Sequence, residues 1–431
     1  MKGTYKFNFD NVLKDKIGEN GISIDGIDEL RDFTNIAKAN VSKKYENGEL
    51  GFIEALDKDL DEYEKVKELS KEFEYVIIIG IGGSILGSKA VHQGIYGSSN
   101  TYHPKVFYLD NSDPEKIYET LKAVKLEKTL IFVISKSGNT VETLANYFVI
   151  KKHMDKNNII PAKPNFVAIT GGGLLQKIAE KEGYMCYKVP ENVGGRFSVL
   201  SAVGLAPLAC LNVDIHNLVK GARKMNDICH TDNIFRNPAL LNALIHYKMD
   251  NRGKKISLMM PYIGRLHQFG MWYRQLWAES LGKDGNGQTP VIALGATDQH
   301  SQLQLYMDGP EDKIMTFLKV NKFKQDYSIE TDYDSDLIEH KLSELIISEQ
   351  LGTEQSITEK GIPNVKITLS ELNEYTLGML MYGYELQTAY CGELLCINAF
   401  NQPAVEHAKK LSHAVLKGSI VEKSYNEIKI E

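Results

Sequence analysis

Residues 135–140 read Ser-Lys-Ser-Gly-Asn-Thr and gather hydroxyl and ammonium groups where an apolar run gives way to an amphipathic stretch starting at Val141. This change of pattern predicts a strand followed by a helix, and the first turn of a helix offers unpaired N–H groups and the positive end of its dipole. Such a loop is suited to holding a phosphate. Its candidate ligands are Ser135, Lys136, Ser137 and Thr140. Because Ser, Gly and Asn are also ordinary turn and capping residues, the loop alone leaves a structural role open.

A glycine-rich loop, GIGGSILG at 80–87, follows another apolar run. Its tight turn would let the backbone of Gly83 and the hydroxyl of Ser84 approach a bulky group. A dinucleotide site is disfavoured because Ile85 stands where the fingerprint needs its third glycine, and Asp110 lies too far along the chain. No GxxxxGK[ST] motif occurs, which disfavours a P-loop nucleotide site. A bare strand-to-helix turn remains an alternative.

Two charged residues farther along could act on a substrate. Two glycines precede Arg196, so the backbone could fold tightly there and direct a guanidinium suited to a delocalised oxyanion into a cleft. Glu279 lies near the end of the helical stretch 269–281, where a carboxylate could serve as a general base. Taken alone, a glutamate near a helix end is most often a solvated surface residue.

Bulk composition describes an ordinary globular chain of 431 residues, with 43% hydrophobic and 25% charged residues. A formal net charge of −6 and the lack of a long basic block disfavour a nucleic-acid partner. The N-terminus has no apolar signal region, and the longest nearly apolar stretch, 199–211, is too short to cross a bilayer. We therefore expect a cytoplasmic protein without membrane association.

The elements that must position these residues form two α/β units in tandem. Short β-branched runs alternate with helical stretches, which predicts parallel sheets covered on both faces. The runs lie at 75–80, 106–109, 129–134, 165–170, 184–189, 256–260, 290–294 and 314–318. Polar residues 321–336 form an exposed connection before helical patterning resumes to about Leu416. We expect an N-terminal helical segment, a phosphate-binding domain, a second α/β domain and a C-terminal helical segment, at 1–74, 75–225, 238–400 and 401–431.

Both candidate loops follow strands of the first predicted sheet. In open parallel sheets, ligands bind beyond the carboxyl ends of the strands, where successive connections leave in opposite directions. The loops at 80–87 and 135–140 are therefore expected to meet at one sheet edge.

Several motifs together resemble the phosphoglucose isomerase family in the family's own order. The motifs are GIGGSxLG (80–87), NSDP (111–114), SKSGNTxET (135–143), VGGRFSxxSAxG (193–204), ESLGKDG (279–285), TDQHSQLQL (297–305) and NAFNQPAVEHAK (398–409). Two departures occur in the last motif, where Asn401 replaces the usual aspartate and Ala404 the usual glycine. Asn401 keeps the ability to cap a helix, and Ala404 would only narrow the space near a substrate.

This resemblance implies two sugar-isomerase (SIS-type) doubly wound parallel-sheet domains with additional N- and C-terminal helices. It implies an aldose–ketose isomerase that interconverts glucose 6-phosphate and fructose 6-phosphate through a cis-enediolate, in glycolysis and gluconeogenesis. No metal or redox cofactor is expected, because the substrate's own carbonyl is the electron sink.

The resemblance also implies roles for individual residues. Glu279 would move the proton between C1 and C2, and Arg196 would stabilise the enediolate. His300 would open the sugar ring in the neighbouring subunit, which implies a homodimer with shared sites, while Lys409 would lie beside the ring oxygen. The substrate's phosphate and remaining groups would contact Gly83, Ser84, Ser135, Lys136, Ser137, Thr140 and Gln402. The helix-start position of Glu142 favours a dipole-stabilising role instead.

The sequence leaves three other functions open. A catalytically silent sugar-phosphate sensor could use the same phosphate loops, but it would have no need for Glu279, His300 and Lys409 together. A nicotinamide dehydrogenase is disfavoured by Ile85. An isomerase that also accepts mannose 6-phosphate is chemically closest, because epimerisation shares the enediolate.

Overall fold

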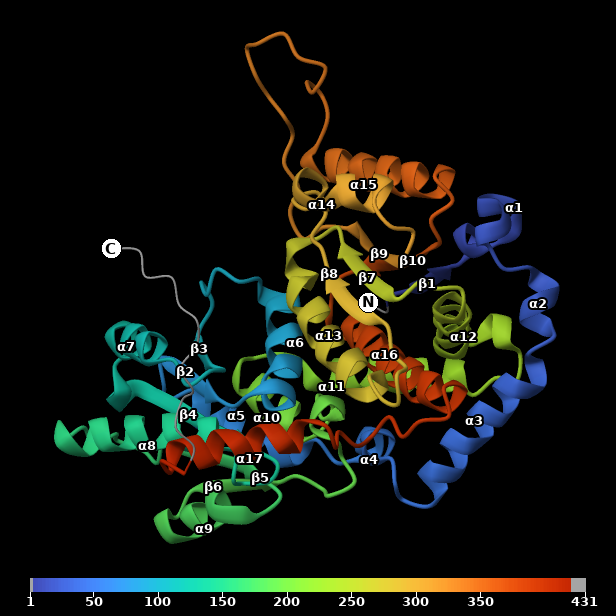
Figure 1. Cartoon of the computed structure of the whole chain (residues 1–431). Coiled ribbons are helices and arrows are strands. Elements are labelled where there is room, and N and C mark those ends of the chain that lie inside the picture. The colour runs from blue at the N-terminus through green and yellow to red at the C-terminus, as the bar shows by residue number, and fades with distance from the viewer. Residues whose placement is uncertain (1–2, 420–431) are drawn as a thin grey trace, which may run out of the picture.

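The computed structural model describes residues 3–419 and contains two five-stranded sheets joined by a layer of helices (Figure 1). The two sheets and their helices confirm the predicted α/β class. Residues 420–431 of the predicted C-terminal segment 401–431, like residues 1 and 2, lie outside the described residues.

The first sheet is wholly parallel, in the order β3-β2-β4-β5-β6. Every residue of β4 is buried, as a central strand covered by helices on both faces requires. The strands are β2 (Tyr75–Ile79), β3 (Lys105–Leu109), β4 (Thr129–Ser135), β5 (Phe166–Thr170) and β6 (Met185–Lys188), which confirms the five predicted runs. The helices that follow them in the chain are α6 (Leu86–Tyr96), α7 (Pro114–Ala123), α8 (Val141–Lys156) and α9 (Gly173–Glu182).

The second sheet has the order β1-β10-β9-β7-β8, with β1 antiparallel at its edge. Its strands are β1 (Tyr5–Asn8), β7 (Ile256–Pro261), β8 (Thr289–Ile292), β9 (Lys313–Lys322) and β10 (Asn364–Glu371). The sequence patterns predicted β7, β8 and β9. They wrongly assigned the residues of β1 and β10 to helical regions. In β10 the buried Val365, Ile367 and Leu369 alternate with polar residues, a period-two signal that the surrounding helical pattern concealed. β1 forms because Tyr5 and its neighbours pair with that edge.

The remaining helices wrap and connect the two sheets. The N-terminal set is α1 (Lys14–Ile17), α2 (Ile24–Asp28), α3 (Arg31–Glu46), α4 (Gly51–Glu54) and α5 (Glu64–Ser70). The later set is α10 (Ala202–Cys210), α11 (Ile215–Cys229), α12 (Pro238–Asn251), α13 (His267–Leu281), α14 (Gln299–Asp308), α15 (Leu342–Glu359), α16 (Glu374–Leu394) and α17 (Val405–Leu416). The polar connection between β9 and α15 projects from the body as the orange loop at the top of Figure 1. None of the helices within residues 3–419 is long and apolar enough to span a bilayer.

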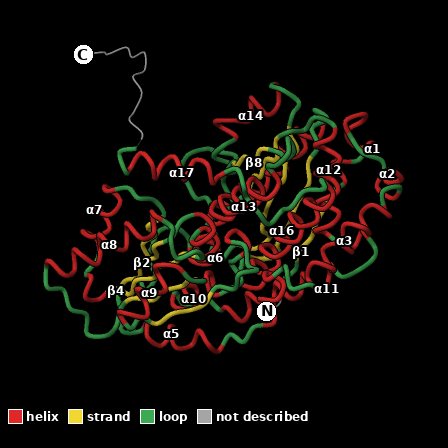
Figure 2. Tube along the Cα trace, turned by 60° about the horizontal axis from the view of Figure 1, so that its bottom comes forward, coloured by secondary structure: helices red, strands yellow, loops and turns green. Residues whose placement is uncertain are grey.

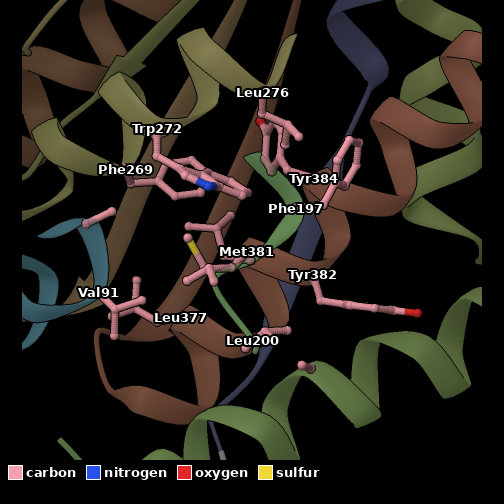
Figure 3. Packing of buried hydrophobic residues seen from close by; sticks show 14 of the residues in the cluster. Val91, Phe197, Leu200, Phe269, Trp272, Leu276, Leu377, Met381, Tyr382 and Tyr384 are labelled. Carbon is pink, nitrogen blue, oxygen red and sulfur yellow. The ribbon is translucent and has the colours of Figure 1, made fainter. Parts of the chain in front are cut away.

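Helix α16 lies at the centre of the core and is buried over nearly its whole length. It packs against α11, α12 and α13, and Figure 3 shows Met381 and Tyr384 of α16 beside Trp272 and Leu276 of α13. One continuous cluster of buried side chains extends from the first sheet through these helices to the second sheet. The two sheets are therefore fixed relative to each other by close packing, which holds any site between them in one geometry.

The buried His246 of α12 predicts an acid-sensitive core. Its side chain is 1% exposed, its Nδ1 lies 2.9 Å from the carbonyl oxygen of Asn242, and burial lowers its pKa to about 4. Between pH 6.5 and 4 the unfolded chain binds a proton that the folded chain does not, so the free energy of unfolding falls as the pH falls through this window. The lowering of the pKa from 6.5 to about 4 corresponds to about 3 kcal/mol of the free energy of unfolding, lost when the pH has fallen to 4. His246→Phe should reduce the stability loss between pH 7 and 4.5 by about 2–3 kcal/mol, measured by urea denaturation. The exposed His216→Gln should leave the loss unchanged, and an equal loss in His246→Phe and wild type would contradict the assignment.

Candidate functional site

A polar cavity of about 480 Å³ lies beyond the carboxyl edge of the first sheet, where α13 and the segment before α17 meet it. The loops after β2, β4, β5 and β6 line one side. Most of the sequence-predicted residues come together here: Gly83, Ser84, Lys136, Ser137, Thr140, Arg196, Glu279, Gln402 and Lys409.

The loop after β4 presents its polar groups to this cavity. The Nζ of Lys136 donates to the carbonyl oxygen of Glu191 at 2.8 Å, and burial lowers the pKa of this lysine. Thr140 stands at the N-terminal cap of α8, but its hydroxyl makes no cap bond and lies 2.8 Å from the Ser135 hydroxyl. Ser135 is 1% exposed and does not line the cavity, so the structure places it behind Thr140. This side of the cavity thus combines a cation, two hydroxyls and the start of a helix, which is a favourable anion site.

The glycine loop after β2 touches the loop that carries Arg196. An added Cβ on Gly83 would lie 2.2 Å from the carbonyl carbon and oxygen of Gly195 and 2.6 Å from the backbone nitrogen of Arg196. Only glycine allows this approach, so the loop has a packing requirement beyond that of a bare turn.

The guanidinium of Arg196 is held by protein groups on every side. Arg196 as a whole is 3% exposed. Burial lowers the pKa of its guanidinium, and the Glu279 carboxylate opposes that shift. Its partners are the Ser280 hydroxyl (2.6 Å), a Glu279 carboxylate oxygen (3.2 Å), the Gln402 amide oxygen (2.9 Å) and the backbone oxygens of Ala399 (2.6 Å) and Asn401 (3.1 Å). These five acceptors match the five N–H groups of an arginine.

Glu279 lies in the last turn of α13, and its side chain is 36% exposed at the cavity. One carboxylate oxygen accepts from Arg196, and the other accepts from the Gln275 amide at 3.0 Å, one turn earlier on the same helix. The carboxylate is therefore oriented by two donors while it remains accessible from the cavity, which is the geometry that a proton-transferring base needs.

Lys409 reaches the cavity from α17, which has no buried residue and runs along the edge of the molecule (Figure 2). Its Nζ lies 2.7 Å from a carboxylate oxygen of Glu406, one turn earlier, and its side chain is 65% exposed.

His300 does not line the cavity of its own chain. It is exposed at the start of α14, and Figure 1 shows α14 beside the second sheet, well above α17. Within one chain the structure therefore leaves this residue apart from the others.

Some lining and supporting residues were not singled out from the sequence. Gln275 lies one helical turn before Glu279, a spacing that could have indicated it. Lys283 donates to the backbone oxygens of Ser280 and Asn398, both at 2.6 Å, and burial beside Arg196 lowers its pKa to about 8. Within residues 3–419, no three His, Cys, Asp or Glu side chains gather in an arrangement that could hold a metal ion.

The fold and the cavity define a doubly wound α/β protein with a polar cavity and an oriented carboxylate at one sheet edge. The profile of the Phosphoglucose isomerase family matches residues 53–428. The chain belongs to the phosphoglucose isomerase family.

Similar proteins extend over nearly the whole chain. A probable glucose-6-phosphate isomerase of Methanococcus maripaludis is 56% identical over 98% of this chain and 97% of its own length. The glucose-6-phosphate isomerase of Methanocaldococcus jannaschii is 47% identical over 95% of this chain and 99% of its own length. Among solved structures, a glucose-6-phosphate isomerase from Chlamydia trachomatis is 25% identical, covers 83% of this chain and 73% of its own, and has a TM-score of 0.72.

The contact at Gly83 gives a first test of the site's packing. Gly83→Ala should lower the free energy of unfolding by about 1–3 kcal/mol, because the methyl group forces the two loops apart. Urea denaturation measures this change. Gly352→Ala is the matched control, since an added Cβ there meets nothing within 4 Å and a helical alanine should be neutral or slightly stabilising. A Gly83→Ala protein as stable as wild type would show that the loops are not packed this closely.

Proposed function

We propose that this protein interconverts glucose 6-phosphate and fructose 6-phosphate by proton transfer through a cis-enediolate. The observation that carries the proposal is that the oriented Glu279 carboxylate and the phosphate-type loop 136–140 line one cavity. Family membership and relatives that carry this name support it.

The phosphate of the substrate would bind at the loops after β2 and β4. Lys136 supplies the charge, and Ser84, Ser137 and Thr140 supply hydroxyl donors, with Ser135 orienting Thr140 from behind. Binding at this remote group fixes the reacting carbons near Glu279 and lowers the entropic cost of the reaction.

Glu279 would take the C2 proton and return it at C1. Gln275 and Arg196 fix the two oxygens of the carboxylate. All five N–H groups of Arg196 already have acceptors, so we infer that it stabilises the enediolate mainly through its charge. It would also hold Glu279 and Gln402 in place for the reaction.

Opening of the sugar ring would use Lys409 and a His300 supplied by a second copy of the chain. The exposed position of His300, outside the cavity of its own chain, supports a homodimer whose two sites are each completed by the partner. A cytoplasmic location fits this role.

Glu279→Gln should lower turnover of fructose 6-phosphate by about 10²–10⁴, because the amide keeps the shape of the side chain but cannot accept the proton. Binding of the sugar phosphate should stay largely intact, since the phosphate loops are unchanged. A coupled dehydrogenase assay gives turnover and calorimetry gives affinity, with mannose 6-phosphate run in parallel for substrate breadth. Glu142→Gln, outside the cavity on α8, is the matched control and should keep wild-type turnover. Wild-type turnover in Glu279→Gln would show that Glu279 is not the base.

Mixed dimers test the shared site. Co-refolding equal amounts of the inactive variants His300→Ala and Glu279→Gln should restore about a quarter of wild-type activity, because half of the dimers are mixed and each has one intact site. Co-refolding Lys409→Ala with Glu279→Gln is the control. Both of those residues belong to the same chain's cavity, so no mixed dimer has an intact site. Equal recovery in the two mixtures, or none in the first, would refute the exchange of His300 between subunits.

A further inference from the structure

The two halves of the chain repeat one strand order. In the first sheet β2 pairs with β3 on one side and with β4 on the other, and β5 lies beyond β4. In the second sheet β7 likewise pairs with β8 on one side and with β9 on the other, and β10 lies beyond β9. The first strand of each half runs into a 3-10 turn, Gly82–Ser84 or Gly264–Leu266, and then into a helix. These corresponding helices, α6 and α13, pack against each other.

The catalytic cavity combines the carboxyl edge of the first sheet with the last turn of α13. A second cavity, of about 660 Å³, is built from the corresponding parts of the opposite halves of the chain. It combines the carboxyl edge of the second sheet with the last turn of α6. Its lining comes from the loop after β7 (Ile263, Gly264, Arg265), the end of β9 (residues 322–325), the end of β10 (residues 371–373) and the end of α6 (Gln93, Gly97, Ser98).

The lining of this second cavity carries three cations against one carboxylate. Within residues 3–419, neither Arg265 nor Lys322 has an ion-pair partner within 4.0 Å. Lys324 donates to the backbone oxygen of Ile95 at 3.1 Å. The single carboxylate, Glu371, lies beside Lys322 in the strand register and accepts from the Asn373 amide at 3.2 Å. Positive charge in a concave site attracts anions.

The last turn of α6 differs from that of α13 in one decisive respect. Where α13 presents Glu279 to the catalytic cavity, α6 presents Gln93, with Gly97 and Ser98 just beyond the helix. The second cavity therefore has cations and neutral donors but no carboxylate on its helix that could move a proton.

We propose that this second cavity is a non-catalytic binding site for a phosphoryl-bearing anion. Arg265 and Lys322 supply the charge-assisted hydrogen bonds, in the place that the phosphate loops occupy in the first half. The volume accommodates an anion larger than a single phosphate, such as a diphosphate or a sugar phosphate.

Equilibrium dialysis with labelled pyrophosphate at fixed ionic strength tests this site in the full-length protein. The measurements are made in a Lys136→Gln background, which weakens anion binding at the first cavity. Adding Arg265→Gln and Lys322→Gln should raise the dissociation constant at least about tenfold, because two charged contacts are lost. Wild-type protein with only these two substitutions should keep its isomerase activity, since neither residue lines the catalytic cavity.

Lys43→Gln in the same background is the matched control, because it removes one charge from an exposed position on α3. It should leave the dissociation constant unchanged. Pyrophosphate affinity that is insensitive to Arg265→Gln and Lys322→Gln would overturn the proposal. So would an equal loss in Lys43→Gln, which would mean general charge attraction, or a Lys136→Gln protein that binds no pyrophosphate.

Discussion

The site depends on the hydrogen bonds that the buried guanidinium of Arg196 makes. A buried charge is costly unless it is paired and fully hydrogen-bonded, and here all five N–H groups find acceptors. Those acceptors come from the end of α13 and from residues 399–402, so one side chain joins three distant parts of the chain. The charge can be buried only when these parts are assembled, and their assembly is also what places Glu279 at the cavity.

The rest of the architecture supplies the rigidity that this pairing needs. One continuous core connects both sheets through α16, so the ends of α6 and α13 cannot move independently. The contact between Gly83 and Gly195 brings the phosphate side of the cavity against the Arg196 loop. The loops after β2 and β4 and the Glu279 carboxylate consequently line one cavity in a fixed arrangement, and such an arrangement would suit the positioning of a substrate.

Duplication of the strand order gives two cavities of reciprocal construction but different chemistry. Both lie at the carboxyl ends of the parallel strands of a sheet, as the topology dictates. The difference comes from residues near the helix ends: Glu279 lies in the last turn of α13, and Gln93 lies in the last turn of α6. The fold places one cavity at each sheet edge, and the side chains decide the chemistry of each.

The sequence by itself determined the strands with continuous apolar runs, the phosphate-type loops and the family, because these signals are local in the chain. The strands at Tyr5–Asn8 and Asn364–Glu371 were missed, since the first exists by pairing with the second. Only the tertiary structure decided that Ser135 faces inward behind Thr140, or that Arg196 meets Gln402 across 206 residues. Such contacts depend on how helices and sheets pack, and no local pattern encodes them. The exposed place of His300 likewise follows from topology, because α14 follows β8 of the second sheet and lies away from the cavity at the edge of the first sheet.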